Sequence, residues 1–261
     1  METLSYLLLG LVQGLTEFLP VSSSGHLTLG QAMLGLGEED LTFTVLVHAA
    51  TALSTVVVFR QDIGALIRDV LRAGDEGSKA RTYTGLLLLS ALPAAVVGLG
   101  FKDAIEALAT PRFVGAMLCV TAAILYLSQR ATSGTNSLGA LPALGIGLAQ
   151  ACAILPGISR SGSTIGAALM LGVSRGEAAR FSFLMALIPI GGATLLTLKD
   201  LMDAPAQAAT GPWTGYIVGT VAAFVSGWVA CTWMIRLVKR SNLAGFGAYC
   251  LAAGILALIF G

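Results

Sequence analysis

Long apolar stretches dominate this chain and constrain its fold more than any other feature. Only 11% of its 261 residues are charged and 56% are hydrophobic, whereas soluble domains carry about 25% charged residues. Six stretches approach the roughly 20 residues that a helix needs to cross a bilayer. They are Leu41–Arg60, Tyr83–Phe101, Phe113–Leu127, Phe181–Leu198, Gly215–Ile235 and Ala244–Phe260. The sequence therefore predicts an all-α polytopic membrane protein and excludes a soluble domain.

The second half of the chain repeats the first at an offset of 137 residues. Gly10–Gln13 matches Gly147–Gln150, with only a valine-to-alanine difference, and Ser22–Gly25 matches Ser159–Gly162 at the same offset. The offset also carries the first three apolar stretches onto the last three. Such agreement is not expected by chance in a sequence with few polar residues, so the chain contains two copies of one unit.

The segments that carry the serine clusters differ from the apolar spans. Leu4–Leu36 and Ala140–Val173 are each apolar, then interrupted by Pro, Gly and Ser, then apolar again. We predict that each is a re-entrant helical hairpin, since irregular backbone at membrane depth is tolerated where protein buries it or a wet cavity is lined. A single membrane domain over 1–261 then contains two repeats, about 4–129 and 140–260, each with one hairpin and three transmembrane helices.

The distribution of basic residues orients this arrangement. Three spans per repeat is an odd number, so the second repeat is inverted, as in inverted-repeat transporters. The inversion places eleven Lys and Arg residues on one side: Arg60, Arg68, Arg72, Lys79, Arg81, Arg130, Arg175, Arg180, Arg236, Lys239 and Arg240. The opposite side receives Lys102, Arg112 and Lys199. The positive-inside rule makes the first side cytoplasmic, and the first hairpin then opens outward.

The second hairpin contains an anion-binding sequence around Arg160. Glycines let the backbone approach a ligand, hydroxyls donate hydrogen bonds, and a helix expected to begin near Gly162 points its positive end into the loop. The arginine adds a planar donor fork that matches phosphate oxygens. The predicted anion-binding residues are Gly157, Ser159, Arg160, Ser161, Gly162 and Thr164.

The first hairpin supplies groups that could carry chemistry. Ser23 and His26 are candidate nucleophiles or acid–base groups. Gln13 and the hydroxyls of Ser22 and Ser24 are predicted to bind substrate. Gln13 and Glu17 stand four residues apart, so they share one helix face. Glu17 could hold a divalent cation, orient His26, or do both. Together with the facing anion loop, these residues indicate phosphoryl transfer.

Simpler interpretations exist for the ionisable residues in these segments. A charge at such depth costs roughly 2.5–3.5 kcal/mol and needs a partner, so Glu17 and Arg160 could form a purely structural ion pair. His48 lies within the stretch Leu41–Arg60, and we expect it to be packed or hydrogen-bonded rather than catalytic.

Two motifs resemble the signatures of bacterial undecaprenyl-diphosphatases of the bacitracin-resistance type. Gln13–His26, QGLTEFLPVSSSGH, is similar to the first signature, and Pro156–Thr164, PGISRSGST, is similar to the second. Length, span number and internal repeat agree, so the resemblance covers essentially the whole chain. It implies hydrolysis of undecaprenyl diphosphate to undecaprenyl phosphate and inorganic phosphate, which recycles the lipid carrier for cell-wall synthesis in the bacterial inner membrane.

The resemblance also implies roles for individual residues. Glu17 would be a metal or acid–base residue with Mg²⁺ or Ca²⁺ as cofactor, Arg160 a diphosphate clamp, and Ser23 or His26 the attacking group. The family's first signature usually begins with Glu where this chain has Gln13, so a metal would depend more on Glu17 and on the substrate's phosphates. The expected partners are a polyprenyl diphosphate, membrane lipid and, as an open case, a second copy in a homodimer. The sequence has no basic tail and no interleaving of aromatic and basic residues, so nucleic acid is not an expected partner.

A lipid-carrier flippase or anion transporter is the alternative, because inverted repeats with broken helices are also a transporter design. Ser and His beside Glu favour catalysis, since a carrier needs hydrogen-bond donors but no nucleophile.

Overall fold

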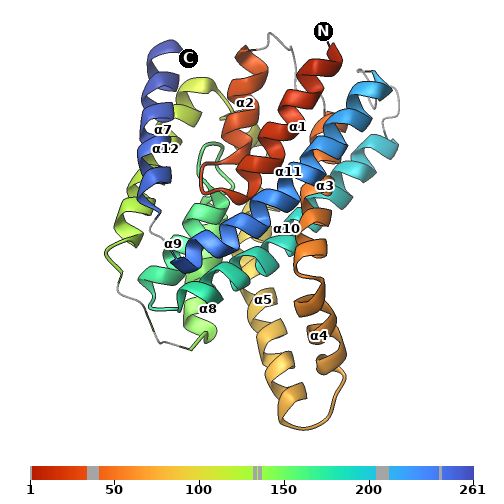
Figure 1. Cartoon of the computed structure of the whole chain (residues 1–261), viewed down its shortest axis with the longest axis vertical. Helices are drawn as coiled ribbons and strands as arrows, with labels where there is room; N and C mark the ends of the chain where they lie inside the picture. The colour runs from red at the N-terminus through yellow and green to blue at the C-terminus, as the bar shows by residue number, and fades with distance from the viewer. Residues whose placement is uncertain (1, 34–40, 132–133, 135–136, 204–211, 241–242) are drawn as a thin grey trace.

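The computed structural model describes the chain except residues 1, 34–40, 132–133, 135–136, 204–211 and 241–242. Its described residues fold into α-helices, which gather in one bundle with a protruding arm (Figure 1). The helices are α1 Glu2–Phe18, α2 Ser23–Met33, α3 Leu41–Val58, α4 Arg60–Val70, α5 Asp75–Gly100, α6 Lys102–Glu106, α7 Pro111–Ser128, α8 Ala140–Cys152, α9 Arg160–Met170, α10 Arg175–Asp203, α11 Trp213–Arg240 and α12 Ala244–Phe260.

Each of the six predicted apolar stretches coincides with a helix, namely α3, α5, α7, α10, α11 and α12. Within the described residues, α5, α7, α10 and α11 are long and apolar enough to cross a membrane, and a fifth span is reached if α3 and α4, bent by 72°, count as one. The apolar helix α12 has 17 residues and falls just short of that length. The protein is thus a helical multi-pass membrane protein.

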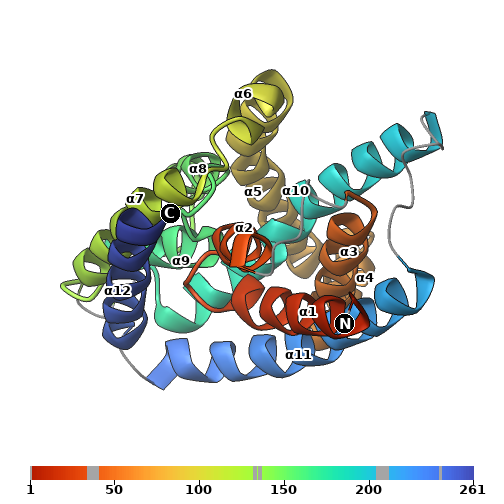
Figure 2. The same cartoon turned by 90° about the horizontal axis from the view of Figure 1, so that it is seen from above.

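Both serine-bearing segments are helix–loop–helix hairpins, as predicted. α1 descends from the N-terminus and α2 returns to the same end of the molecule (Figures 1 and 2). Ser22 adopts a left-handed backbone with φ 71° between these helices. In the second loop Gly157 has φ 96°, and a Cβ there would lie 2.6 Å from the carbonyl oxygen of Val114. Only glycine fits such a backbone conformation so close to a neighbouring helix.

The helix after the second loop begins at Arg160, two residues earlier than the predicted start near Gly162. Ser159 is the reason, because its extended backbone and its side chain cap the helix, with Oγ accepting from the Gly162 N–H at 3.1 Å. Serine is a preferred N-cap because it satisfies a free N–H of the first turn. Arg160 therefore stands in the first helical turn and not in the loop.

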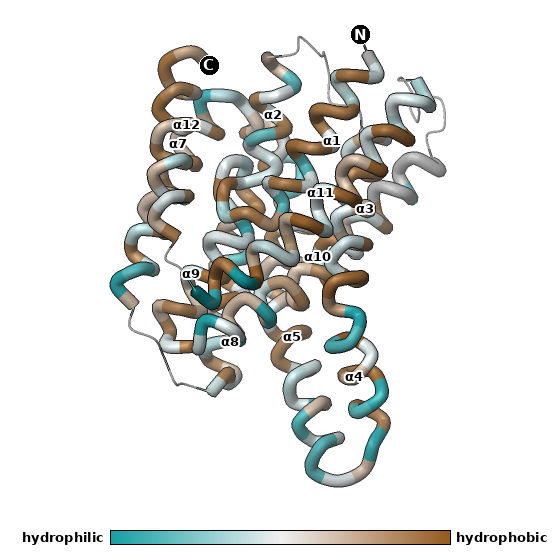
Figure 3. The backbone as a smooth tube through the Cα atoms, viewed as in Figure 1, coloured by the Kyte–Doolittle hydropathy of each residue, from teal (hydrophilic) through white to brown (hydrophobic). Residues whose placement is uncertain are grey.

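The segment between the first two spans forms the protruding arm. α4 packs against the first turns of α5, and the tube is largely hydrophilic there (Figure 3). Arg180 of α10 donates from Nε to Oδ1 of Asp62 at 2.7 Å, which ties the base of the arm to the bundle.

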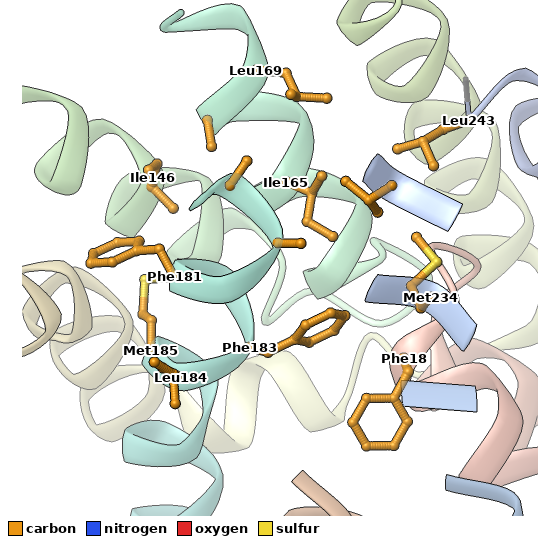
Figure 4. Close-up of a cluster of buried hydrophobic side chains, with 14 of the residues drawn as sticks. Phe18, Ile146, Ile165, Leu169, Phe181, Phe183, Leu184, Met185, Met234 and Leu243 are labelled. Atoms are coloured by element: carbon orange, nitrogen blue, oxygen red, sulfur yellow. The ribbon is translucent and has the colours of Figure 1, made fainter. Parts of the chain in front are cut away.

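The largest buried core lies where the two hairpins meet α10 and α11. Ile165 of α9 and Phe183 of α10 lie near Phe18 of α1 and Met234 of α11 (Figure 4). The ring centroids of Phe18 and Phe183 are 5.9 Å apart. This packing fixes the end of α1 relative to α9 and so positions the polar residues beside them.

Glycines let the first helix of each hairpin pack closely on a long helix. α1 packs on α11, where a Cβ on Gly10 would lie 2.1 Å from the carbonyl oxygen of Gly219. α8 packs on α5, where a Cβ on Gly147 would lie 2.4 Å from the carbonyl oxygen of Ser90. Small residues permit such contact between membrane helices. Gly10 and Gly147 are equivalent in the sequence repeat.

We expect Gly147→Ala to lower stability by about 1–3 kcal/mol, because the added methyl group forces α8 away from α5. Thermal unfolding of the purified protein in detergent measures the change. Gly85→Ala on α5 is the matched control, since a Cβ there meets no atom within 4 Å and alanine favours helix. Equal unfolding temperatures for the two variants would show that the close α5–α8 contact does not limit stability.

Candidate functional site

The two hairpins meet through Glu17 and Arg160, which lie 143 residues apart in sequence. Arg160 Nη2 donates to Glu17 Oε1, and the two side chains are 16% and 6% exposed. Glu17 belongs to the last turn of α1 and Arg160 to the first turn of α9. The ion pair that the simpler interpretation considered is therefore present, and the charge of each residue is balanced by the other.

The second carboxylate oxygen of Glu17 accepts two more hydrogen bonds. Ser23 Oγ donates to Oε2 at 2.6 Å, and Gln13 Nε2 donates to the same atom at 3.0 Å. Ser23 is the first residue of α2, so the turn between α1 and α2 brings its hydroxyl back onto the carboxylate. A serine bonded to a buried carboxylate beside an arginine has a proton acceptor and an anion clamp within reach.

The second loop is held in place by hydroxyl groups. Thr121 Oγ1 of α7 donates to the carbonyl of Gly157 and accepts from the Ser159 N–H, both at 3.0 Å. Ser161 Oγ donates to the Leu19 carbonyl at 3.0 Å and thereby joins the two hairpins. Thr164 Oγ1 is bonded to the Arg160 carbonyl at 2.8 Å. Ser161 and Thr164 thus brace the site, and Thr121, which the sequence did not single out, braces it as well.

A cavity of about 440 Å³ lies over these residues. Apolar residues from α5, from the loop after α8 and from α10, such as Ala94, Ile154 and Pro189, form part of its wall. Its polar lining is contributed by Thr16, Glu17, Ser22, Ser23, Ser24, Thr28, Thr44, His48, Gln150, Ser159, Arg160 and Thr194. The cavity thus offers hydrogen-bond donors and one arginine beside an apolar wall, as a phosphorylated lipid head requires.

His26 lies beside this group but turns toward α12. Its Nδ1 is 2.8 Å from the Ser22 carbonyl and its Nε2 is 2.7 Å from the Tyr249 hydroxyl, with the two rings stacked. Both ring nitrogens are engaged, and His26 is not among the described residues that line the cavity. The structure therefore brings Glu17, Ser23 and Arg160 together. It places His26 outside the cavity lining, beside Tyr249, which no sequence signal indicated.

His48, expected to be packed or hydrogen-bonded, lines the cavity. Its Nδ1 is 2.8 Å from the Thr44 carbonyl, which agrees with the expected hydrogen bond. Gln150 also lines the cavity. The only sequence signal for Gln150 was its equivalence to Gln13 in the repeat.

A divalent cation would have few protein ligands here. Among the described residues no group of three or more His, Cys, Asp and Glu side chains could hold a metal ion. Gln13 Oε1 is buried without a hydrogen-bond partner among the described residues, but Gln13, predicted to bind substrate, does not line the cavity. Mg²⁺ is commonly bound by one or two carboxylates with substrate phosphates and waters. The residues therefore fit a cation that obtains most of its ligands from a phosphorylated substrate.

The fold and site define a class, a multi-pass membrane protein with a cavity lined by an arginine and by a carboxylate-bonded serine. Comparison with known proteins narrows this class. The family described as bacitracin resistance protein BacA matches residues 6–256. An undecaprenyl-diphosphatase of Christiangramia forsetii is 46% identical over 100% of this chain and 98% of its own length. Those of Bacteroides fragilis (strain YCH46) and Halothermothrix orenii are 45% and 38% identical, each over 99% of this chain and 98% of their own length. This chain belongs to the BacA family.

Proposed function

We propose that this protein is an undecaprenyl-diphosphate phosphatase that releases inorganic phosphate and returns undecaprenyl phosphate to cell-wall synthesis. The observation that carries the proposal is the Ser23–Glu17–Arg160 contact inside the cavity. Relatives over the full length of the chain bear the name undecaprenyl-diphosphatase. The recycled lipid carrier also accounts for bacitracin resistance, the property that gives the family its name.

In the proposed reaction the diphosphate occupies the cavity with its terminal phosphate at Arg160. The guanidinium, Ser159 and the free N–H groups at the start of α9 neutralise its charge. Ser23 Oγ attacks the terminal phosphorus and gives its proton to Glu17. The bond between that phosphorus and the bridging oxygen breaks, and undecaprenyl phosphate leaves. Water then displaces the phosphate from Ser23, and Glu17 returns the proton to the serine.

Ser23 is preferred over His26 as the attacking group because of their contacts. Ser23 lines the cavity and donates to a carboxylate, whereas the ring nitrogens of His26 are bonded to Ser22 and Tyr249. His26 would then fix the turn that carries Ser23. Mg²⁺ or Ca²⁺ held by Glu17 and by the substrate's phosphates would neutralise charge on the substrate when bound.

The same proposal includes an inverted repeat in the bacterial inner membrane. Its support is that α1 packs on α11 of the second repeat while the equivalent α8 packs on α5 of the first, through equivalent glycines. With eleven basic residues on the cytoplasmic side, the cavity would open to the periplasmic or outer face. The homodimer stays a prediction.

Phosphate release by detergent-solubilised protein tests this function. An enzyme hydrolyses undecaprenyl diphosphate in micelles, whereas a flippase or anion transporter needs a sealed membrane and releases no phosphate. We expect inorganic phosphate to form in proportion to protein concentration. Transport of the lipid by proteoliposomes, with no phosphate release in either preparation, would support the transporter instead.

A further inference from the structure

Gln150 is a buried polar residue that the proposed chemistry does not use. It stands on α8, is 2% exposed and lines the cavity. Neither its Nε2 nor its Oε1 has a hydrogen-bond partner within the described residues. An unpartnered amide buried in protein is unfavourable by about 1–3 kcal/mol, so both atoms call for an explanation.

The internal repeat explains why the Gln150 amide has no hydrogen-bond partner among the described residues. Gln13, the equivalent residue in α1, donates to Glu17 one helical turn later. Four residues after Gln150 stands Ile154, just beyond the end of α8, which also lines the cavity and whose side chain offers no acceptor. Gln150 lines the cavity whereas Gln13 does not, and only the first repeat supplies a carboxylate for its amide.

We propose that the missing partner of Gln150 is the diphosphate itself, so that its carboxamide N–H groups donate to phosphate oxygens across from Arg160. The proposal rests on the proposed function and extends the substrate site to α8. An amide is a neutral donor, which adds hydrogen bonds to a trianionic head group without a second buried charge. In the free protein the carboxamide N–H groups have no acceptor among the described residues, and the phosphate oxygens of the substrate supply one.

Gln150→Leu tests the proposal, because leucine fills a similar volume without a donor. We expect KM for undecaprenyl diphosphate to rise about tenfold or more, as for loss of a hydrogen bond to a charged group, with a small change in kcat. The Kd for farnesyl diphosphate, measured by titration calorimetry on the full chain in detergent, should rise in parallel. The unfolding temperature should be unchanged or higher, since an unsatisfied amide is removed.

Gln129→Leu is the matched control. The Nε2 of Gln129 is also buried without a partner, but the residue does not line the cavity. KM and Kd should stay at the wild-type values in this variant. Unchanged KM and Kd in Gln150→Leu would overturn the proposal, as would unfolding of both Gln150→Leu and Gln150→Met, because Gln150 would then be structural.

The two readouts separate this proposal from the proposed function. Wild-type protein that releases no phosphate but binds farnesyl diphosphate, with binding weakened by Gln150→Leu, would contradict the function and support the role of Gln150. Identical phosphate release by the wild type and by Gln150→Leu would support the proposed function and contradict the role of Gln150. A wild-type protein that neither hydrolyses nor binds a diphosphate would overturn both.

Discussion

Arg160→Ala is expected to lower kcat/KM for undecaprenyl diphosphate on the order of 10³-fold. The variant removes the one arginine that lines the cavity among the described residues and with it the fork that meets the phosphate oxygens. Loss of one donor that stabilises transition-state charge lowers the rate by about 10²–10³. Loss of the positive charge also weakens binding of the anionic substrate. Phosphate release by purified protein measures the effect.

Folding must be separated from chemistry in this experiment, because Arg160→Ala leaves Glu17 buried without its ion-pair partner. Such removal of one partner destabilises by about 3–5 kcal/mol. The double variant Glu17→Gln with Arg160→Ala removes both charges and should regain unfolding temperature without regaining activity. Arg160→Lys keeps the charge but loses the planar fork, so it should retain intermediate activity. Wild-type activity in a folded Arg160→Ala protein would contradict the assigned site.

Ser23→Ala is expected to lower kcat at least 10³-fold, since no other hydroxyl is bonded to the Glu17 carboxylate among the described residues. Loss of a nucleophile commonly has an effect of this size or larger. His26→Gln should lower kcat by a factor at least ten times smaller than Ser23→Ala does, because the ring of His26 faces Tyr249. Steady-state phosphate release by both variants makes the comparison.

Tyr249→Phe is the control for the histidine, as it removes only the hydroxyl group that bonds Nε2. If His26 acts by holding the turn, Tyr249→Phe and His26→Gln should have similar small effects. The opposite ranking, in which His26→Gln is the inactive variant and Ser23→Ala retains activity, would assign the attack to the imidazole.

The sequence predicted most of the fold because a membrane leaves few choices. Stretches of apolar residues with Pro, Gly and Ser interruptions fix where spans and hairpins fall, and the observed α12 matches the predicted Ala244–Phe260 residue for residue. The meeting of Glu17 with Arg160 could also be anticipated, since two buried opposite charges need each other.

The orientation of single side chains could not be predicted in the same way. Whether His26 or His48 faces the cavity depends on the rotation of α2 and α3 about their own axes, which tertiary packing decides. Tyr249 pairs with His26 across 223 residues, and an aromatic residue in an apolar helix carries no mark of such a contact. The helix start at Arg160, two residues before the expected start, depends on the Ser159 cap.

The ion pair that joins the hairpins has a consequence for how activity could arise. The candidate nucleophile and its proton acceptor belong to the N-terminal repeat, whereas the phosphate clamp belongs to the C-terminal one. Neither half of the polypeptide alone would hold a complete centre. Catalysis would therefore begin only after both halves have inserted and docked. A chain still being synthesised on the ribosome would have no activity.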